Sequence, residues 1–260
     1  MSDEMTLGII GAGSFAAYFV ASLRRSGSKA EISVSPRNRR IAEHLAANHG
    51  CLIAEDNAAV AKSSKIVLLA VRPPDVVSAL SGVQFEPDQT LISAVAGVSC
   101  SELKTHAGRV RRIVRIMPAA YIETGLGFFP IYPEDDLVRS FLTPAGIVTS
   151  FASEEEFGTA LLGACLSGWL YAFFDDLVKT FQKYGISEEV ARQLVLANVR
   201  GTANYAMETP GRSLQEISDS IATDGTYTLA GLNELLGAVP FSGWRSALDT
   251  VEKLRRGAER

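Results

Sequence analysis

The chain has 260 residues, 47% of them hydrophobic, and a formal net charge of −4 at pH 7, so it can bury one large core or two smaller ones. The negative charge argues against broad nucleic-acid binding, no run approaches the ~18 to 20 apolar residues of a membrane span, and the N-terminus lacks the basic and apolar regions of a signal peptide. We therefore expect a soluble, cytoplasmic protein that binds neither nucleic acid nor membranes.

The first expected strand, Thr6–Ile10, leads directly into Gly11-Ala12-Gly13-Ser14-Phe15-Ala16 and an apolar helix. A strand followed by G-x-G-x-x-A and a helix is typical of dinucleotide-binding sites, whereas glycines without that context also mark ordinary turns. Gly11 would make the tight turn, Gly13 would let the backbone approach a pyrophosphate, and small Ala16 would allow close helix–strand packing. The phosphates would bind free N–H groups at the helix N-terminus. The predicted cofactor contacts here are Gly11, Gly13, Ser14, Phe15 and Ala16.

The second strand is expected over residues 30–35, and its end should lie beside the adenosine ribose. An NAD-specific site places Asp or Glu there, but this chain continues with Ser35-Pro36-Arg37-Asn38-Arg39-Arg40. Arginine binds phosphate bidentately and stays charged, so this segment suits a 2′-phosphate and favours NADP. Arg39 and Arg40 alternatively form a solvated face at the start of the next helix. Ser35 and Arg37 are therefore the expected contacts.

Strand-like and helix-like patterns continue to alternate along the N-terminal part of the chain. A helix is expected over residues 40–48. Further strands are expected over residues 51–54, 65–71, 90–96, 112–117, 125–132 and 147–151. Continuous apolar strands that alternate with helices predict a doubly wound parallel sheet with right-handed crossovers. The fold class is therefore α/β, with a Rossmann-type cofactor domain over residues 1–150.

From Ser153 onward the periodicity becomes helical. Helices are expected over residues 154–183, 187–208 and 213–221. The first is apolar nearly all round between residues 161 and 181, so it must be buried, and a second subunit is the simplest cover. We predict an all-helical dimerisation domain over residues 151–260 and a homodimer or a higher oligomer of dimers. The polar, basic C-terminus from Lys253 is expected to fray.

No metal site is expected. The three cysteines are widely spaced in apolar surroundings, which indicates reduced thiols rather than disulfides or metal ligands: Cys51, Cys100 and Cys165. The three histidines have no second ligand at metal spacing and are expected at the surface: His44, His49 and His106.

Eight segments together carry a likeness to one known family. They are Gly11-Ala12-Gly13-Ser14-Phe15-Ala16, Ser35-Pro36, Asn57, Leu69-Ala70-Val71-Arg72-Pro73, Ala96-Gly97-Val98-Ser99, Val114-Arg115-Ile116-Met117-Pro118, Ser167-Gly168 and Thr223-Asp224-Gly225-Thr226-Tyr227-Thr228-Leu229-Ala230-Gly231-Leu232. Over nearly its whole length the sequence resembles the pyrroline-5-carboxylate reductase family, which reduces a cyclic imine to proline with NADPH. The last segment is the most specific, because it matches the family's C-terminal signature.

The resemblance implies roles for the matching positions. Ser35, Arg37 and Asn57 would hold the adenosine ribose and its phosphate. The nicotinamide half would lie along Ala70, Val71, Arg72, Pro73, Ala96 and Gly97. Thr228 would bind the imino-acid substrate at a helix N-terminus. The same loop would be shaped by Thr223 and Gly225. A plain helix cap is the alternative role for Thr228, and both roles can hold at once.

Several positions depart from the family pattern. Ala119-Ala120-Tyr121 stands where the family has Asn-Thr-Pro, Trp169 lies where it has a turn rich in glycine and proline, and Asp224 replaces a proline. Three functions therefore remain open: a pyrroline-5-carboxylate reductase, a relative that reduces another imine or a carbonyl, and an NADP-binding protein without catalysis. Related hydroxy-acid dehydrogenases use a lysine in the first inter-domain helix, and here none precedes Lys179, which disfavours carbonyl reduction.

Overall fold

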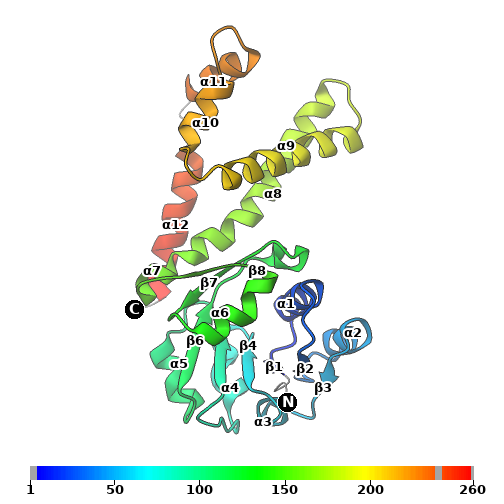
Figure 1. The fold of residues 1–260 in the computed structure, drawn as a ribbon, viewed down its shortest axis with the longest axis vertical. Coiled ribbons are helices and arrows are strands. Elements are labelled where there is room, and N and C mark those ends of the chain that lie inside the picture. The colour runs from blue at the N-terminus through cyan, green and yellow to red at the C-terminus, as the bar shows by residue number, and fades with distance from the viewer. Residues whose placement is uncertain (1–4, 238–241, 259–260) are drawn as a thin grey trace. The chain divides into compact units, whose positions relative to one another are not determined.

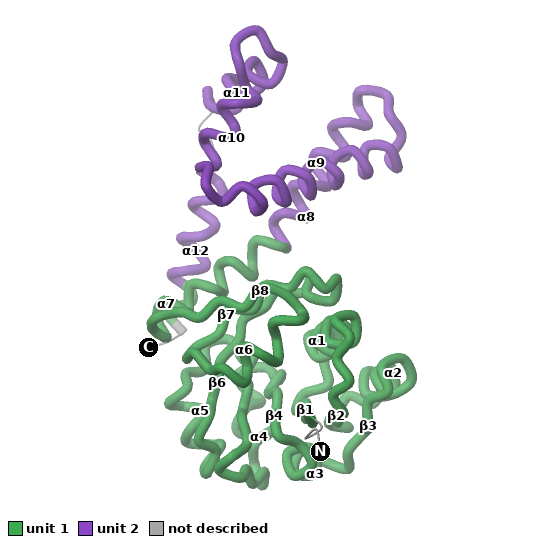
Figure 2. Tube along the Cα trace, in the orientation of Figure 1, with its two compact units in different colours: residues 1–167, 254–260 green, residues 168–253 purple. Residues whose placement is uncertain are grey.

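The computed structural model describes residues 5–237 and 242–258. The chain divides into two compact units, one of residues 1–167 with 254–260 and one of residues 168–253 (Figure 2). Among the described residues, the first unit contains a sheet with its flanking helices, and the second contains only helices.

Within the described residues, eight strands form one sheet in the order β3-β2-β1-β4-β5-β6-β7-β8 (Figure 1). They are β1 (Thr6–Ile10), β2 (Glu31–Val34), β3 (Leu52–Ile53), β4 (Ile66–Leu69), β5 (Thr90–Ser93), β6 (Arg112–Ile116), β7 (Gly127–Tyr132) and β8 (Gly146–Ser150). Neighbouring strands are parallel except β6 and β7, which are antiparallel. The predicted α/β class with a doubly wound sheet is thus confirmed, and the sheet departs from the expected parallel arrangement only at the β6–β7 pair.

Helices connect these strands and cover the sheet (Figure 1). They are α1 (Ser14–Arg25), α2 (Arg39–His49), α3 (Asn57–Lys62), α4 (Val76–Leu80), α5 (Cys100–Ala107), α6 (Asp136–Leu142) and α7 (Glu154–Gly158), with short 3-10 helices η1 (Pro73–Asp75), η2 (Ala120–Thr124) and η3 (Thr143–Ala145). The strand order reverses between β1 and β4, because β2 and β3 extend the sheet on one side and β5 on the other.

The sheet separates two hydrophobic cores, and strand β4 contributes to both. Ile66 and Leu68 join the core that contains Phe19 of α1, whereas Val67 and Leu69 join the core that contains Leu103 of α5. Successive residues of a strand point to opposite faces, so a strand of four consecutive buried apolar residues needs cover on both sides. This explains why the continuous apolar runs in the sequence became the central strands.

Among the described residues, the helical unit contains five helices, two of which are shared with the first unit. They are α8 (Ala160–Lys183), which begins in the first unit, α9 (Glu188–Glu208), α10 (Leu214–Ile221), α11 (Tyr227–Gly237) and α12 (Ser242–Ala258), which ends in the first unit. The helix expected over residues 154–183 is interrupted at Thr159. The expected fraying from Lys253 is wrong as far as Ala258, because α12 continues to that residue and Arg255 is buried. Residues 259–260 lie outside the described residues.

The stretch Glu154–Lys183 is long and apolar enough to cross a membrane, with a mean hydropathy of 1.5 over an 18-residue window. The expectation that no segment reaches these limits is therefore wrong for this stretch, although the core helix of a soluble protein meets the same limits. Phe173 packs its ring against Trp244 of α12 at 6.1 Å between centroids. Leu170, Tyr171 and Phe173 are nevertheless exposed in the single chain. This apolar surface requires a further cover.

Candidate functional site

A cavity of about 520 Å³ lies at the carboxyl ends of β1, β2 and β4. The crevice where the strand order reverses is where doubly wound sheets bind their ligands. The predicted cofactor residues that line this cavity are Gly11, Gly13, Ser14, Phe15, Ser35, Arg37, Asn57, Ala70, Val71 and Arg72. The structure thus brings together residues that lie up to about sixty positions apart in the sequence.

The glycine-rich turn has the geometry of a phosphate-binding loop. Gly11 has φ +103°, and a Cβ there would lie 2.6 Å from the carbonyl oxygen of Ala70, so neither the turn nor the approach to β4 tolerates a side chain. Gly13 is the N-cap of α1 and offers no side chain to its N–H groups. A Cβ at Gly13 would meet nothing within 4 Å. The N-terminus of α1 therefore faces open space that a pyrophosphate can fill.

Ser35 and Arg37 follow β2 and reach the cavity in different ways. Ser35 is buried, and its Oγ accepts a hydrogen bond of 3.0 Å from the backbone N–H of Gly11. Its hydroxyl thus holds the glycine turn and keeps its own hydrogen available to a ligand. Arg37 extends a side chain that is 74% exposed, and its Nη2 lies 3.6 Å from Oδ2 of Asp75. The arginine that lines the cavity on the side of β2 is therefore Arg37.

Arg39 takes part in a different interaction. Its Nε donates to Oε1 of Glu43 at 2.7 Å, one helical turn along α2. Arg39 and Arg40 do not line the cavity, so the alternative of a solvated helix face describes them. Asn57 does line the cavity, and its Nδ2 donates to the carbonyl oxygen of Ala79 at 2.9 Å. That bond leaves the Asn57 Oδ1 as an acceptor.

Four predicted cofactor residues do not line the cavity: Ala16, Pro73, Ala96 and Gly97. Ala16 is fully buried in the core beneath α1, which is the packing role that its small size suggested. Pro73 opens η1. Ala96 and Gly97 lie in the connection between β5 and α5.

Asn38, whose amide lies in the segment expected to suit a 2′-phosphate, also lines the cavity. Four further lining residues were not predicted: Ala12, Asp75, Ala79 and Ala94. Ala94 follows β5 directly, and its N–H donates to the carbonyl oxygen of Leu69 at 2.9 Å, so it lies beside Ala70. The rule that strand ends meet at one edge of a parallel sheet would have found it. Asp75 comes from the connection after β4, and no pattern in the sequence predicts that it lies near Arg37.

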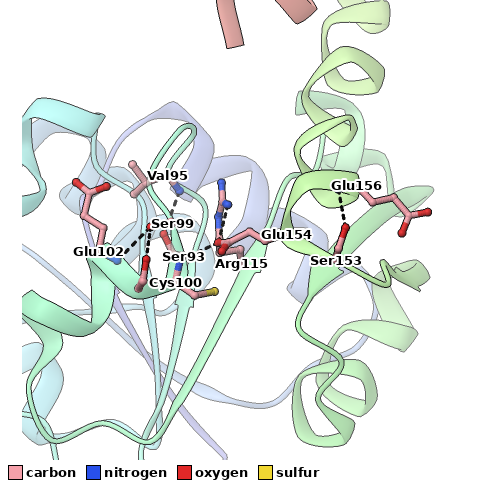
Figure 3. A network of polar contacts seen from close by, with 10 residues as sticks. Ser93, Val95, Ser99, Cys100, Glu102, Arg115, Ser153, Glu154 and Glu156 are labelled. Carbon is pink, nitrogen blue, oxygen red and sulfur yellow. Dashed lines mark hydrogen bonds and ion pairs between the residues drawn. The ribbon is translucent and has the colours of Figure 1, made fainter. Parts of the chain in front are cut away.

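A network of polar contacts holds the connection after β5 (Figure 3). Glu154 accepts a bond of 2.7 Å from the backbone N–H of Cys100 and one of 2.8 Å from Nη1 of Arg115. The Arg115 guanidinium also lies 4.9 Å from the ring centre of Phe157. Ser99 caps α5 by accepting from the N–H of Glu102. The segment that contains Ala96 and Gly97 is therefore anchored at its α5 end.

Cys100 is not a nucleophile in this arrangement. Burial, followed by the negative charge of Glu154, raises the pKa of its thiol to about 12, so the thiol stays protonated at neutral pH. All three cysteines have free thiols. The part of the chain that the structure describes contains no group of three His, Cys, Asp or Glu that could hold a metal ion.

The predicted substrate residues lie together in the helical unit, at the start of α11. Gly225 has φ +81° and turns the loop. Thr226 caps the helix, because its Oγ1 accepts from the N–H of Leu229 at 3.1 Å and donates to the carbonyl oxygen of Thr223 at 2.7 Å. The alternative that Thr228 is the cap is therefore wrong. Thr228 lies inside the first turn of α11, and its side chain is exposed.

Two parts of the chain match protein-family models. Residues 6–97 match the model described as NADP oxidoreductase, coenzyme F420-dependent, and residues 155–251 match the model for pyrroline-5-carboxylate reductase dimerisation. The second match covers the helical unit and identifies it as a dimerisation domain.

Relatives of known name match nearly the full length. The pyrroline-5-carboxylate reductase of Haemophilus influenzae is 29% identical over 87% of this chain and 87% of its own. The solved structure of the Streptococcus pyogenes enzyme has a TM-score of 0.82 at 24% identity and covers 99% of both chains. The Plasmodium falciparum pyrroline carboxylate reductase, solved with NADP bound, has a TM-score of 0.82 at 20% identity and covers 100% of this chain and 98% of its own. The match to the pyrroline-5-carboxylate reductase dimerisation model and the likeness to curated relatives of that name along most of the chain together support the pyrroline-5-carboxylate reductase family.

Proposed function

We propose that this protein reduces 1-pyrroline-5-carboxylate to proline with NADPH. The proposal rests on one combination of features in this chain. The cavity has the layout of a dinucleotide site with no acid at the end of β2, and a later segment matches the model for pyrroline-5-carboxylate reductase dimerisation. The named relatives align along most of both chains, which favours the same activity over a fusion of unrelated domains.

The residues proposed to bind NADP are those named from the sequence. They are Gly11, Gly13, Ser14, Phe15, Ala16, Ser35, Arg37, Asn57, Ala70, Val71, Arg72, Pro73, Ala96 and Gly97. The open N-terminus of α1 and the exposed guanidinium of Arg37 fit the pyrophosphate and the 2′-phosphate respectively. We divide the chain functionally into a cofactor domain over residues 1–150 and a substrate and dimerisation domain over residues 151–260.

The reaction needs little acid–base chemistry from the protein. NADPH, when bound, would supply a hydride for the imine carbon, and water can provide the proton for the imine nitrogen because a cyclic imine is readily protonated near neutral pH. The chain's contribution is to hold the two rings face to face. Thr228 would donate a hydrogen bond to the substrate's nitrogen or carboxylate. Thr223 and Gly225 would shape the loop that binds the carboxylate.

The dimerisation domain points to an assembly of at least two chains. We propose a homodimer, or a higher oligomer of dimers, in which the exposed apolar side chains of α8 are covered by the partner chain. That cover accounts for the apolar stretch Glu154–Lys183 without a membrane. The protein is then a cytoplasmic enzyme that binds a small imino acid and neither nucleic acid nor lipid.

One observation favours a second function. Ala119 and Ala120 replace polar residues that the family places after its Met-Pro pair, and Ala119 is buried. A pocket altered here would suit another imine or carbonyl substrate.

A spectrophotometric screen of NADPH oxidation with five-membered and six-membered cyclic imino acids separates these functions. Turnover of the five-membered ring alone supports the reductase proper, and turnover of other substrates supports the second function. Tight NADPH binding without any turnover would instead indicate a protein that only binds the nucleotide.

A further inference from the structure

Arg37 and Asp75 face each other across one side of the cofactor cavity, which both line. Arg37 lies just after β2, whereas Asp75 ends η1 in the connection that follows β4. Their charged groups lie 3.6 Å apart, measured from Nη2 to Oδ2, and the Asp75 side chain is 34% exposed. NAD-specific sites carry an acid at the end of β2. Here the carboxylate reaches the same region from a neighbouring connection.

Among the described residues, we find no other structural role for the Asp75 side chain. Asp75 occupies the N-cap position of α4, yet its side chain makes no capping hydrogen bond. The hydroxyl of Ser78 donates to the backbone carbonyl oxygen of Asp75 and not to its carboxylate. Among the described residues, Arg37 is the one polar partner of this carboxylate. The carboxylate is therefore free to respond to whatever binds Arg37.

We propose that Asp75 determines cofactor selectivity by competing with the 2′-phosphate of NADPH for Arg37, an inference that rests on the proposed use of NADP. When the phosphate binds, the Arg37 guanidinium leaves its ion pair with the Asp75 carboxylate and pairs with the phosphate instead. Asp75 then remains close to a second negative group and repels it. NADH instead carries a 2′-hydroxyl, which can donate a hydrogen bond to a carboxylate. Asp75 thus lowers the preference of the site for NADPH over NADH.

The test measures binding to the full-length protein, so it does not depend on the substrate. Nucleotide fluorescence reports the affinities for NADPH and NADH, and calorimetry those for adenosine 2′,5′-bisphosphate and AMP. Asp75→Asn should bind NADPH and the bisphosphate about three- to tenfold more tightly at low salt, and NADH and AMP equally or less tightly. The gain should shrink in ~0.5 M salt, because ions screen exposed charges. It should become smaller when Arg37→Ala is also present, because the competition for Arg37 is then lost and only the repulsion between Asp75 and the phosphate remains to be relieved.

Two further variants control for charge and for folding. Glu31→Gln removes the same charge at the opposite end of β2 and should leave all four affinities unchanged. Asp75→Ser is neutral and still suits an N-cap, so it should reproduce the result of Asp75→Asn if the charge is responsible.

An unchanged ratio of NADPH to NADH affinity in both Asp75 variants would overturn the role of Asp75 and leave the proposed function intact. An equal gain in Glu31→Gln would also overturn it, since the effect would then come from net charge. If the wild-type protein binds neither NADPH nor the bisphosphate, the cofactor assignment itself fails, and this inference fails with it.

Discussion

Arg37 is the residue that we propose recognises the 2′-phosphate in this cavity. Its exposed guanidinium is the one beside β2 that lines the site, while Arg39 is paired with Glu43 along α2. A charge-assisted hydrogen bond contributes about 1.5 to 3 kcal/mol. Arg37→Ala should therefore raise the KM for NADPH by roughly ten- to a hundredfold and leave the KM for NADH little changed.

Steady-state kinetics with both cofactors would check this, with Arg40→Ala as the matched control. Arg40 is exposed and does not line the cavity, so its loss should change neither KM. A wild-type enzyme that uses NADPH and NADH equally well would contradict the assignment of Arg37.

Thr228 offers a second prediction at the scale of one residue. Because Thr226 caps α11, Thr228→Val removes a hydroxyl without removing the cap. If that hydroxyl bonds the substrate mainly in the transition state, turnover should fall roughly ten- to a hundredfold, equivalent to about 1 to 3 kcal/mol, with NADPH affinity unchanged. Thr226→Val should instead lower the free energy of unfolding by about 1 kcal/mol. A Thr228→Val variant that is kinetically silent with every substrate would leave Thr228 without a catalytic role.

At the scale of elements, the Arg115–Glu154 pair connects β6, the start of α5 and α7 (Figure 3). The Arg115 side chain is only 7% exposed, so removing its counter-charge leaves a buried cation without compensation. Glu154→Gln should lower the free energy of unfolding by about 1 to 3 kcal/mol in urea titrations. Glu155→Gln, in the same turn of α7 and exposed, should cost far less. Equal losses in the two variants would show that the pair is not responsible.

The elements themselves were largely predictable, for physical reasons that particular residues illustrate. The run Ile66–Leu69 indicated a central strand, because a strand covered on both faces contains no polar positions. The direction of β7 was not predictable, since an apolar strand reads the same in either direction and its pairing with β6 is a non-local choice. The sequence offered Thr228 as a possible helix cap, whereas the structure has Thr226 in that position. The two could not be told apart because neighbouring threonines can both cap a helix. Asp75 was missed because only the folded sheet brings it to Arg37.

At the scale of the whole molecule, we propose that the apolar surface of α8 forms the interface between chains. Leu170, Tyr171 and Phe173 are 37, 61 and 44% exposed in the single chain, and residues 155–251 match a dimerisation model. Light scattering at micromolar concentration should therefore give at least twice the chain mass of 27.9 kDa. Leu170→Glu places a charge on this surface, and burying an unpaired charge costs several kcal/mol, so this variant should shift the protein towards monomer or aggregate. Leu126→Glu, at an exposed leucine of the first unit, should keep the wild-type mass. A wild-type chain that remains a stable monomer would show that the apolar surface of α8 is covered in some other way, and the proposed homodimer would be wrong.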